Sequence, residues 1–135
     1  MSDCIFCKII KGEIPADKVY EDKNALAFLD ITPVNPGHIL LVPKKHFKNL
    51  YDLPDSELKN LAPILKKLAI ATKNAVDASG INIHMNNEKS AGQLVAHAHF
   101  HIIPRFSYDG YRHWHGQPYK EGESQQVAKK IKKFL

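Results

Sequence analysis

The spacing of apolar residues changes twice along the chain. Up to residue 42, short apolar runs stand between polar turns, a pattern typical of strands. Between about residues 54 and 78, apolar residues recur every three or four positions, which is the period of a helix, and alternation returns at residue 81. The strands expected from this pattern are 19–21, 25–29, 38–42, 81–86 and 95–103.

Three helices are expected. The long one spans about 54–78, where Pro63 should kink or split it because proline lacks an N–H group, and Gly80 should close it. A short turn or helix is expected at 4–11. An amphipathic helix is expected from Ser124 onward, with lysines that suit the negative end of the helix dipole.

This order of elements predicts an α+β fold with an antiparallel sheet of about five strands, one long helix and short terminal helices. The length of 135 residues suits one domain over 1–135, with a core at about 4–105 and a tail at 106–135. Apolar residues make up 44% of the chain, which is ordinary for globular proteins and excludes a disordered or fibrous chain.

The first residues lack the basic and apolar regions of a signal peptide, and no stretch approaches the roughly 20 apolar residues of a membrane helix. We therefore expect a soluble, cytoplasmic protein without a membrane partner. The net charge of +5 favours anionic ligands only in general terms. In a reducing compartment the pair Cys4 and Cys7 indicates a metal or redox site rather than a disulfide.

The most informative motif is His97-Ala98-His99-Phe100-His101. On a strand the three imidazoles would project from one face about 7 Å apart, and the residues between them would face the core. A solvated histidine-rich edge and a three-histidine zinc centre are the alternatives, and the latter would need further ligands from outside the motif. The polar loop 86–93 just before it could bring its amides and the backbone of Gly92 close to a phosphate.

The segment 92–105 resembles the signature of the histidine triad (HIT) nucleotide hydrolases and transferases. The segments 4–15, 27–31 and 36–46 are similar to the Hint-like branch of that family, and the ending Ile-Ile-Pro-Arg at 102–105 resembles its bacterial-type members. Together these motifs cover nearly the whole chain in the order of the family.

The resemblance implies a homodimer whose two sheets join into one, and a purine nucleotide (AMP- or GMP-like) as substrate or product. It assigns catalysis to the triad: His99 as the nucleophile at the α-phosphorus, His101 as a phosphate contact that places His99, and His97 as the third member. A histidine nucleophile must be neutral, with one ring nitrogen free and the other held as a donor.

The resemblance also implies the binding residues. Asp30 would hold the ribose hydroxyls, and Asn86 and Gln93 would contact phosphate oxygens or the leaving group. The base would lie against Phe6, Phe28, Leu29 and Ile31, and the remaining implied positions are His38, Leu40, Gly92 and Leu94. Two positions depart from the family: Leu94 stands where a serine or threonine is usual, and Ala96 where an aromatic residue is common. Both departures bear on substrate preference and rate.

Cys4 and Cys7 have the spacing of a zinc-binding pair, and a tetrahedral site needs two more ligands. The resemblance nominates His46 and His97 for a structural zinc. The alternative is that two reduced thiols pack as small apolar groups. No organic cofactor is expected.

The leading hypothesis is therefore hydrolysis of a nucleotide at a phosphorus–nitrogen or phosphoanhydride bond, as by a nucleoside phosphoramidase or a dinucleoside polyphosphate hydrolase. A nucleotide sensor without turnover is the alternative. A zinc-containing nucleic-acid module is disfavoured because the basic residues are dispersed and the cysteines lie about 40 residues from His46. The segment 113–115 is interpreted as a surface loop anchored by Trp114 rather than as part of a substrate lip, and nothing in the sequence gives His84 a role in catalysis.

Overall fold

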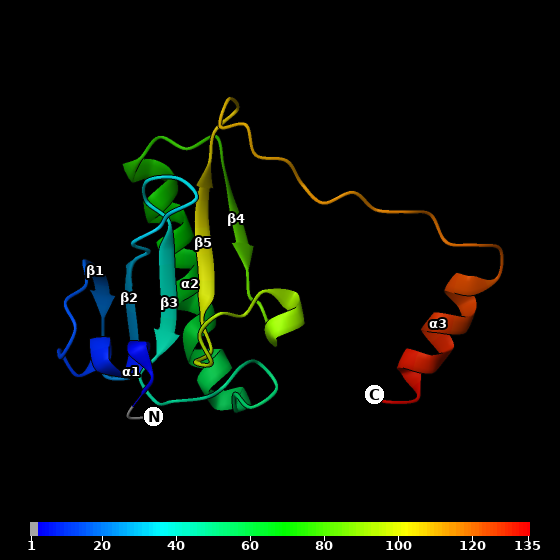
Figure 1. Ribbon diagram of the computed structural model, residues 1–135, viewed down its shortest axis with the longest axis horizontal. Helices are drawn as coiled ribbons and strands as arrows, with labels where there is room; N and C mark the ends of the chain where they lie inside the picture. Colours follow the sequence, from blue (N-terminus) through cyan, green and yellow to red (C-terminus); the bar gives the residue numbers. More distant parts are fainter. Residues whose placement is uncertain (1–2) are drawn as a thin grey trace.

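The computed structural model describes residues 3–135 and contains one five-stranded sheet, with all neighbouring strands antiparallel (Figure 1). The strand order is β1-β2-β3-β5-β4. The strands are β1 (Lys18–Glu21), β2 (Ala25–Leu29), β3 (Ile39–Pro43), β4 (Gly80–His84) and β5 (Phe100–Arg105). The predicted α+β class and the number of strands are confirmed.

Two helices cover opposite faces of this sheet. The long helix α2 (Asp55–Ala75) packs Leu61, Ile64 and Leu68 on one face, against side chains such as Leu41 and Ile102. The short helix α1 (Ile5–Ile10) packs on the other face, against alternate residues of the same strands. Because both faces are covered, every residue of β3 is buried. A short 3₁₀-helix, η1 (Lys89–Ala91), lies in the loop before β5.

The long helix differs from its prediction at two points. It is not split at Pro63, because buried residues on both sides of the proline hold it against the sheet. It ends at Ala75 rather than at Gly80, which is the first residue of β4. Asp77 has a left-handed backbone with φ of 53°, and the N–H of Ala78 bonds back to the carbonyl of Lys73. Asp77 therefore makes the helix-ending turn that was expected of a glycine.

The strand expected over 95–103 forms only over β5. Residues 95–99 form no strand, and the N–H of Ala98 bonds to the carbonyl of Phe47 at 2.7 Å instead of to a sheet neighbour. The strand also continues through Pro104, which needs no N–H there and lies opposite Ile81 in the register. Of the three histidines in the motif, only His101 belongs to the sheet.

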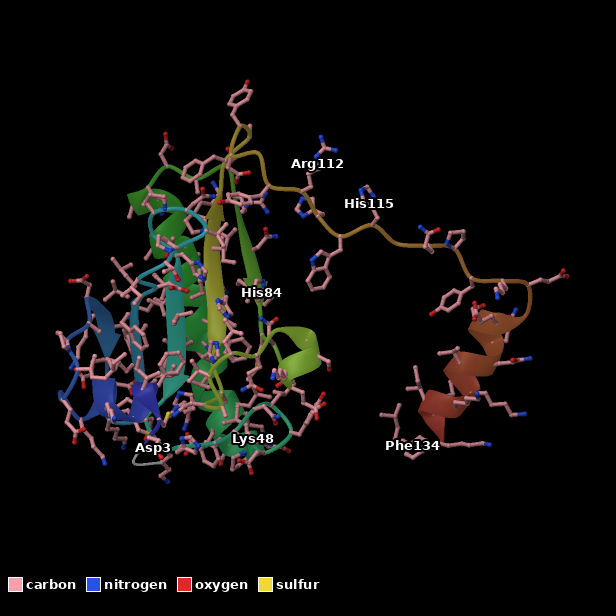
Figure 2. The ribbon with its side chains drawn as sticks, in the orientation of Figure 1. Asp3, Lys48, His84, Arg112, His115 and Phe134 are labelled. Atoms are coloured by element: carbon pink, nitrogen blue, oxygen red, sulfur yellow. The ribbon has the colours of Figure 1, made fainter. Side chains whose placement is uncertain are left out.

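The chain after β5 leaves the sheet beside β4 and runs away from it, as Figure 1 shows in orange. Residues 110–120 form neither helix nor strand, and helix α3 (Glu123–Lys132) follows. Arg112 and His115 lie along the extended segment, and Phe134 lies just beyond the C-terminal end of α3 (Figure 2). The predicted C-terminal helix is confirmed. None of the helices in the described part of the chain has the length and apolar character needed to cross a membrane.

Candidate active site

His99 is buried, and its ring is fixed by one hydrogen bond. Its Nδ1 lies 2.7 Å from the carbonyl oxygen of His97, so Nδ1 carries the proton and donates to that oxygen. Burial lowers the pKa of His99, which keeps the ring neutral at neutral pH. Nε2 is then the unprotonated nitrogen, with a lone pair free for a nucleophilic attack.

His101, unlike His99, carries its ring proton on Nε2, as the hydrogen bonds around it show. The N–H of Val34 donates to Nδ1 of His38 at 3.1 Å, so the proton of His38 is on Nε2. That Nε2 lies 2.9 Å from Nδ1 of His101 and donates to it. His101 therefore carries its own proton on Nε2. Burial, followed by repulsion from the neighbouring imidazoles, lowers the pKa of His101 to about 4, so the ring is a neutral donor at neutral pH.

Both rings lie on the face of the sheet that α1 covers. The ring of Phe6 meets His99 edge-on, with centroids 5.1 Å apart, and the centroids of His99 and His101 are 4.9 Å apart. His97 also contacts Phe6, so all three imidazoles of the motif lie on one side, as the alternation predicted. Phe100 and Ile102 pack on the other side, toward α2.

A pocket of about 450 Å³ opens beside these two rings. Its lining includes His99, His101 and nine further residues that the sequence nominated: Phe6, Phe28, Leu29, Asp30, Ile31, Leu40, Asn86, Gly92 and Leu94. No lysine or arginine lines it, so the positive charge of the chain is not concentrated at this site.

Asp30 stands at the mouth of the pocket, directly after β2. Its Oδ1 accepts a hydrogen bond from the N–H of Thr32 at 2.9 Å, and its Oδ2 lies 3.7 Å from Nε2 of His38. The loop thus fixes the carboxylate while leaving it partly exposed, with 18% of the side chain accessible. A carboxylate held in this way can accept hydrogen bonds from the hydroxyl groups of a ligand.

Three nominated residues do not line the pocket. His38 lies behind His101, as described above. Gln93 is buried, its Oε1 accepts from the N–H of Glu88, and its Nε2 donates to the carbonyls of Lys48 and Val95. The side chain of Gln93 therefore ties the loop 86–93 to the segment before α2. His97 is fully buried and turns to a different cluster.

Sequence reasoning missed part of the lining. The missed residues are Ile5, Ile9, Ile14, Pro15, Ala16, Thr32 and Val95. Ile5 and Ile9 are four residues apart on α1 and follow the same helix face as Phe6, so the helical period could have found them. His84 was also missed. His84, which Figure 2 labels on β4, does not line this pocket. It pairs with His101 in the register of β4 and β5, and the centroids of the two rings are 4.6 Å apart.

His97 belongs to a cluster with Cys4, Cys7 and His46, whose ligand atoms all lie within 4.8 Å of one another. The two Nδ1 atoms are 3.1 Å apart, Sγ of Cys7 is 3.3 Å from Nδ1 of His46, and Sγ of Cys4 is 3.4 Å from Nδ1 of His97. A tetrahedral zinc ion, with bonds of about 2.0–2.3 Å, would hold its ligand atoms about 3.3–3.8 Å apart. The four side chains therefore fit a zinc ion.

The hydrogen bond of the His97 ring also favours metal binding by this cluster. Its Nε2 lies 2.8 Å from the carbonyl of Pro43 and donates to it, which directs the lone pair of Nδ1 into the cluster. Cys4 caps the N-terminus of α1, and Cys7 lies one turn later, with Phe6 between them. A metal held here would join α1 to the segment that carries the histidines.

The segment 113–115 is not anchored as predicted. Trp114 is 94% exposed, so its side chain is not packed against the body of the chain. The expectation of a loop fastened by Trp114 is therefore wrong.

The family of this chain follows from a match between residues 11–108 and the HIT domain. The chain belongs to the HIT domain family. This HIT protein is 55% identical, over 107 residues, to an uncharacterized HIT-like protein of Methanocaldococcus jannaschii, a match that covers 79% of this chain and 82% of that one. The crystal structure of a Streptococcus mutans protein has a TM-score of 0.94 at 43% identity and covers 99% of this chain and 86% of its own.

Other relatives of this HIT protein carry more specific descriptions. A HIT family protein of Bacillus subtilis has a TM-score of 0.92 at 42% identity, over 98% of this chain and 97% of its own. An adenosine 5′-monophosphoramidase of Candida albicans is 44% identical over 77% of this chain and 71% of its own. A zinc-bound histidine triad protein of Mycobacterium smegmatis has a TM-score of 0.78 at 34% identity, over 98% and 96% of the two chains.

Proposed function

We propose that this HIT protein hydrolyses a nucleotide at the α-phosphorus of its nucleoside monophosphate part, cleaving a phosphorus–nitrogen or phosphoanhydride bond. One observation carries the proposal: two neutral imidazoles line one pocket and carry their protons on different ring nitrogens, Nδ1 in His99 and Nε2 in His101. His99 offers a lone pair on Nε2, and His101 offers an N–H on Nε2. A nucleophile beside a neutral donor suits an attack on a phosphate ester or amide.

With adenosine phosphoramidate the reaction has two steps. In the first, Nε2 of His99 bonds to the α-phosphorus, the phosphorus–nitrogen bond breaks with its electron pair going to nitrogen, and the leaving amide takes a proton from solvent to become ammonia. In the second, water attacks the phosphorus, the bond to His99 breaks with its electron pair returning to Nε2, and the water gives up its proton to solvent. His101 donates from Nε2 to a phosphate oxygen in both steps and stabilises the charge there.

The pocket supports a nucleoside next to that phosphate. Phe28, Leu29 and Ile31 offer an apolar wall for the base, and the carboxylate of Asp30 is held to accept from the ribose hydroxyls. The phosphate must be held by neutral donors because no lysine or arginine lines the pocket. Asn86 is one such donor, since its Nδ2 has only a long bond of 3.4 Å to the carbonyl of Gly92. Leu94 offers no hydroxyl and is 93% exposed at the rim.

We also propose that Cys4, Cys7, His46 and His97 hold a structural zinc ion and that the protein is a homodimer. The fit of the four ligand atoms supports the zinc, as does the zinc-bound relative. When bound, zinc would hold the two cysteines as thiolates and would connect α1 to His97 through metal–ligand bonds. His97 then shapes the site through its backbone, since its carbonyl accepts from Nδ1 of His99.

The test is a comparison of the parental protein with His99→Ala on adenosine phosphoramidate. We expect kcat to fall by about 10³-fold or more, because no other side chain replaces the nucleophile, while AMP still binds. Lys59→Gln, on the exposed face of α2, is the control and should keep the parental rate. Mass spectrometry of the quenched reaction should find the nucleotidyl group on His99. Parental turnover by His99→Ala would contradict the mechanism, and AMP binding without turnover by the parental protein would favour a nucleotide sensor.

A further inference from the structure

His84 contacts the proposed active site from the outer strand of the sheet, where Figure 2 labels it. Its ring centroid lies 4.6 Å from that of His101, and the two ring planes are inclined by 39°. The two residues pair in the register of β4 and β5, so both side chains project from the same face of the sheet. His38 approaches His101 from the side of β3, on which β4 does not lie. The ring of His101 therefore stands between two other imidazoles.

These two neighbours of His101 differ in their access to water. His38 is buried and uses both ring nitrogens in hydrogen bonds. His84 is exposed, and its ring makes no hydrogen bond to any group in residues 3–135. The apolar cluster beneath α1 includes residues of β2 and β3 but none of β4, so the helix leaves His84 uncovered. His84 can therefore exchange a proton with water more readily than the buried rings can.

A proton on His84 would place a positive charge directly beside His101. No lysine or arginine lines the pocket, so an anionic phosphate at His99 and His101 meets no permanent cation there. A charge on His84 also acts on the inner rings. Burial first, and repulsion from His84 among the smaller causes, lower the pKa of each of them: His38, His99 and His101.

The charged and titratable side chains around His84 and His101 come from β5, from the segment before β3 and from the segment after β5. They are Arg105, His38, Asp30, Arg112 and His113. Arg105 is bound by both carboxylate oxygens of Asp109. Arg112 and His113 line an open hollow on the outer side, together with His84, and do not line the pocket. Asp30 does line the pocket, but its charge is negative. His84 is thus the group that can bring positive charge next to His101.

We propose that His84 is a positioning residue that acts through His101 and, when protonated, strengthens the hydrogen bond from Nε2 of His101 to a phosphate oxygen. The inference rests on the function proposed above, because it assumes that His101 contacts the phosphate. A positive charge beside His101 makes its N–H a stronger donor and attracts the anion. The same charge opposes protonation of His99, so the lone pair of the nucleophile stays free as the pH falls.

The sign of the pH dependence follows from this arrangement. Burial lowers the pKa of His84, so its ring is neutral at neutral pH and takes up a proton as the pH falls. A bound anion favours the protonated ring and so raises the pKa of His84. By reciprocity, the affinity for the anion must increase as the pH falls through that pKa.

The experiment measures the Kd of the full chain for the methyl ester of AMP by calorimetry at about pH 5 and about pH 8. This ester lacks the second ionisation of AMP, so its phosphate keeps one negative charge at both pH values. The variants are His84→Gln, neutral at both pH values, and His84→Lys, charged at both. His115→Gln, which removes an exposed histidine outside both hollows, is the control.

We expect the parental Kd to be about fivefold lower at the acidic pH, and that of His84→Gln to change by less than about twofold. His84→Lys should show, at the higher pH, the affinity that the parental protein shows at the lower one. His115→Gln should behave as the parental protein. Nitrogen NMR of labelled histidines in the parental protein should find that the ester raises the pKa of His84. Sedimentation checks that each variant has the parental mass at both pH values.

Two results for His84→Gln would overturn the inference: the parental dependence on pH, or an equal loss of affinity at both pH values, which would leave the ring a packing role only. A pKa of His84 that the ester does not change would do the same, and that measurement requires no variant to fold. Hydrolysis of adenosine phosphoramidate is measured in parallel. A protein that binds the ester as expected but does not hydrolyse would contradict the proposed function alone. An active protein whose binding is independent of His84 would contradict this inference alone.

Discussion

At the residue scale, the chemistry of the site depends on which ring nitrogen of each histidine carries the proton. In one series of hydrogen bonds, a backbone N–H donates to His38 and His38 donates to His101. In a second, separate bond, His99 donates to a carbonyl oxygen. None of these partners is charged, and each bond fixes which nitrogen of the His99 and His101 rings carries the proton. Asp30, 3.7 Å from Nε2 of His38, adds a charge that helps to hold this ring in place.

The role of His38 can be tested through His101. His38→Phe removes the donor to Nδ1 of His101, so the proton of His101 is free to move from Nε2 to Nδ1. We expect kcat for adenosine phosphoramidate to fall about 10–100-fold with KM nearly unchanged, as for other residues that orient a functional histidine. His38→Gln, which can still accept from Val34 and donate to His101, should recover part of the rate. Nitrogen NMR of the labelled histidines reads the tautomer directly. An unchanged His101 tautomer in His38→Phe would show that the ring does not depend on this bond.

At the scale of elements, α1 links the cysteine–histidine cluster to the pocket. The helix has only six residues, too few to be stable by itself in water, so its position depends on tertiary contacts. Those contacts are the cluster through Cys4 and Cys7, and the apolar packing of Phe6 and Ile9. Phe6 also meets the ring of His99, so α1 contacts both the cluster and the proposed nucleophile.

Loss of the proposed zinc ion should therefore lower stability and activity together. We expect about one zinc per chain in the purified protein by elemental analysis, and none in Cys7→Ser. The midpoint of thermal unfolding should fall by about 5–10 °C in Cys7→Ser or after chelation, since a metal that binds only the folded chain stabilises it. Lys8→Gln, on the same helix but not a ligand, is the control. Metal-free protein with unchanged thermal stability in chelator would instead support two reduced thiols packed as apolar groups.

The helices and strands also show which parts of the fold can be predicted from the sequence. The period of apolar residues predicts all five strands and three helices, because each element of the body has to bury one face. It fails where a local interaction replaces the periodic one. Residues 95–99 alternate like a strand, but the carbonyl of Phe47 takes the N–H of Ala98 and the ring of His97 enters the cluster. The nominated part of the pocket lining came from the family resemblance, and seven further lining residues were missed. The contact of His84 with His101 depends on a strand register that no local pattern shows.

At the scale of the whole molecule, a network at the end of β5 sets the direction in which residues 110–135, the C-terminal arm, leave the body. Arg105 binds both carboxylate oxygens of Asp109, at 2.8 and 3.1 Å, and also reaches Asn82 of β4 and the carbonyl of Tyr111. The guanidinium and the backbone N–H groups that face Asp109 hold the pKa of its carboxyl well below the usual range. The turn that starts the arm is therefore fastened to the two last strands of the sheet by charge-assisted bonds.

This network gives a prediction that separates the stability of the fold from the chemistry of the pocket. Asp109→Ala removes the carboxylate that joins Arg105, Asn35 and the N–H groups of the turn, so the arm can leave the body in many directions. The guanidinium of Arg105 and the N–H groups of Phe106 and Tyr111 then lose their acceptor. We expect the midpoint of thermal unfolding to fall by about 5–10 °C, since a largely buried, hydrogen-bonded charge loses its partner.

The pocket is expected to stay intact in this variant, because neither Arg105 nor Asp109 lines it. AMP affinity should therefore match that of the parental protein, and Asp109→Asn, which can still accept from the turn, should lower the unfolding midpoint less than Asp109→Ala does. An Asp109→Ala protein with the parental unfolding midpoint would show that this network does not stabilise the fold. Loss of AMP binding in the same variant would show that the turn and the pocket depend on each other through the sheet.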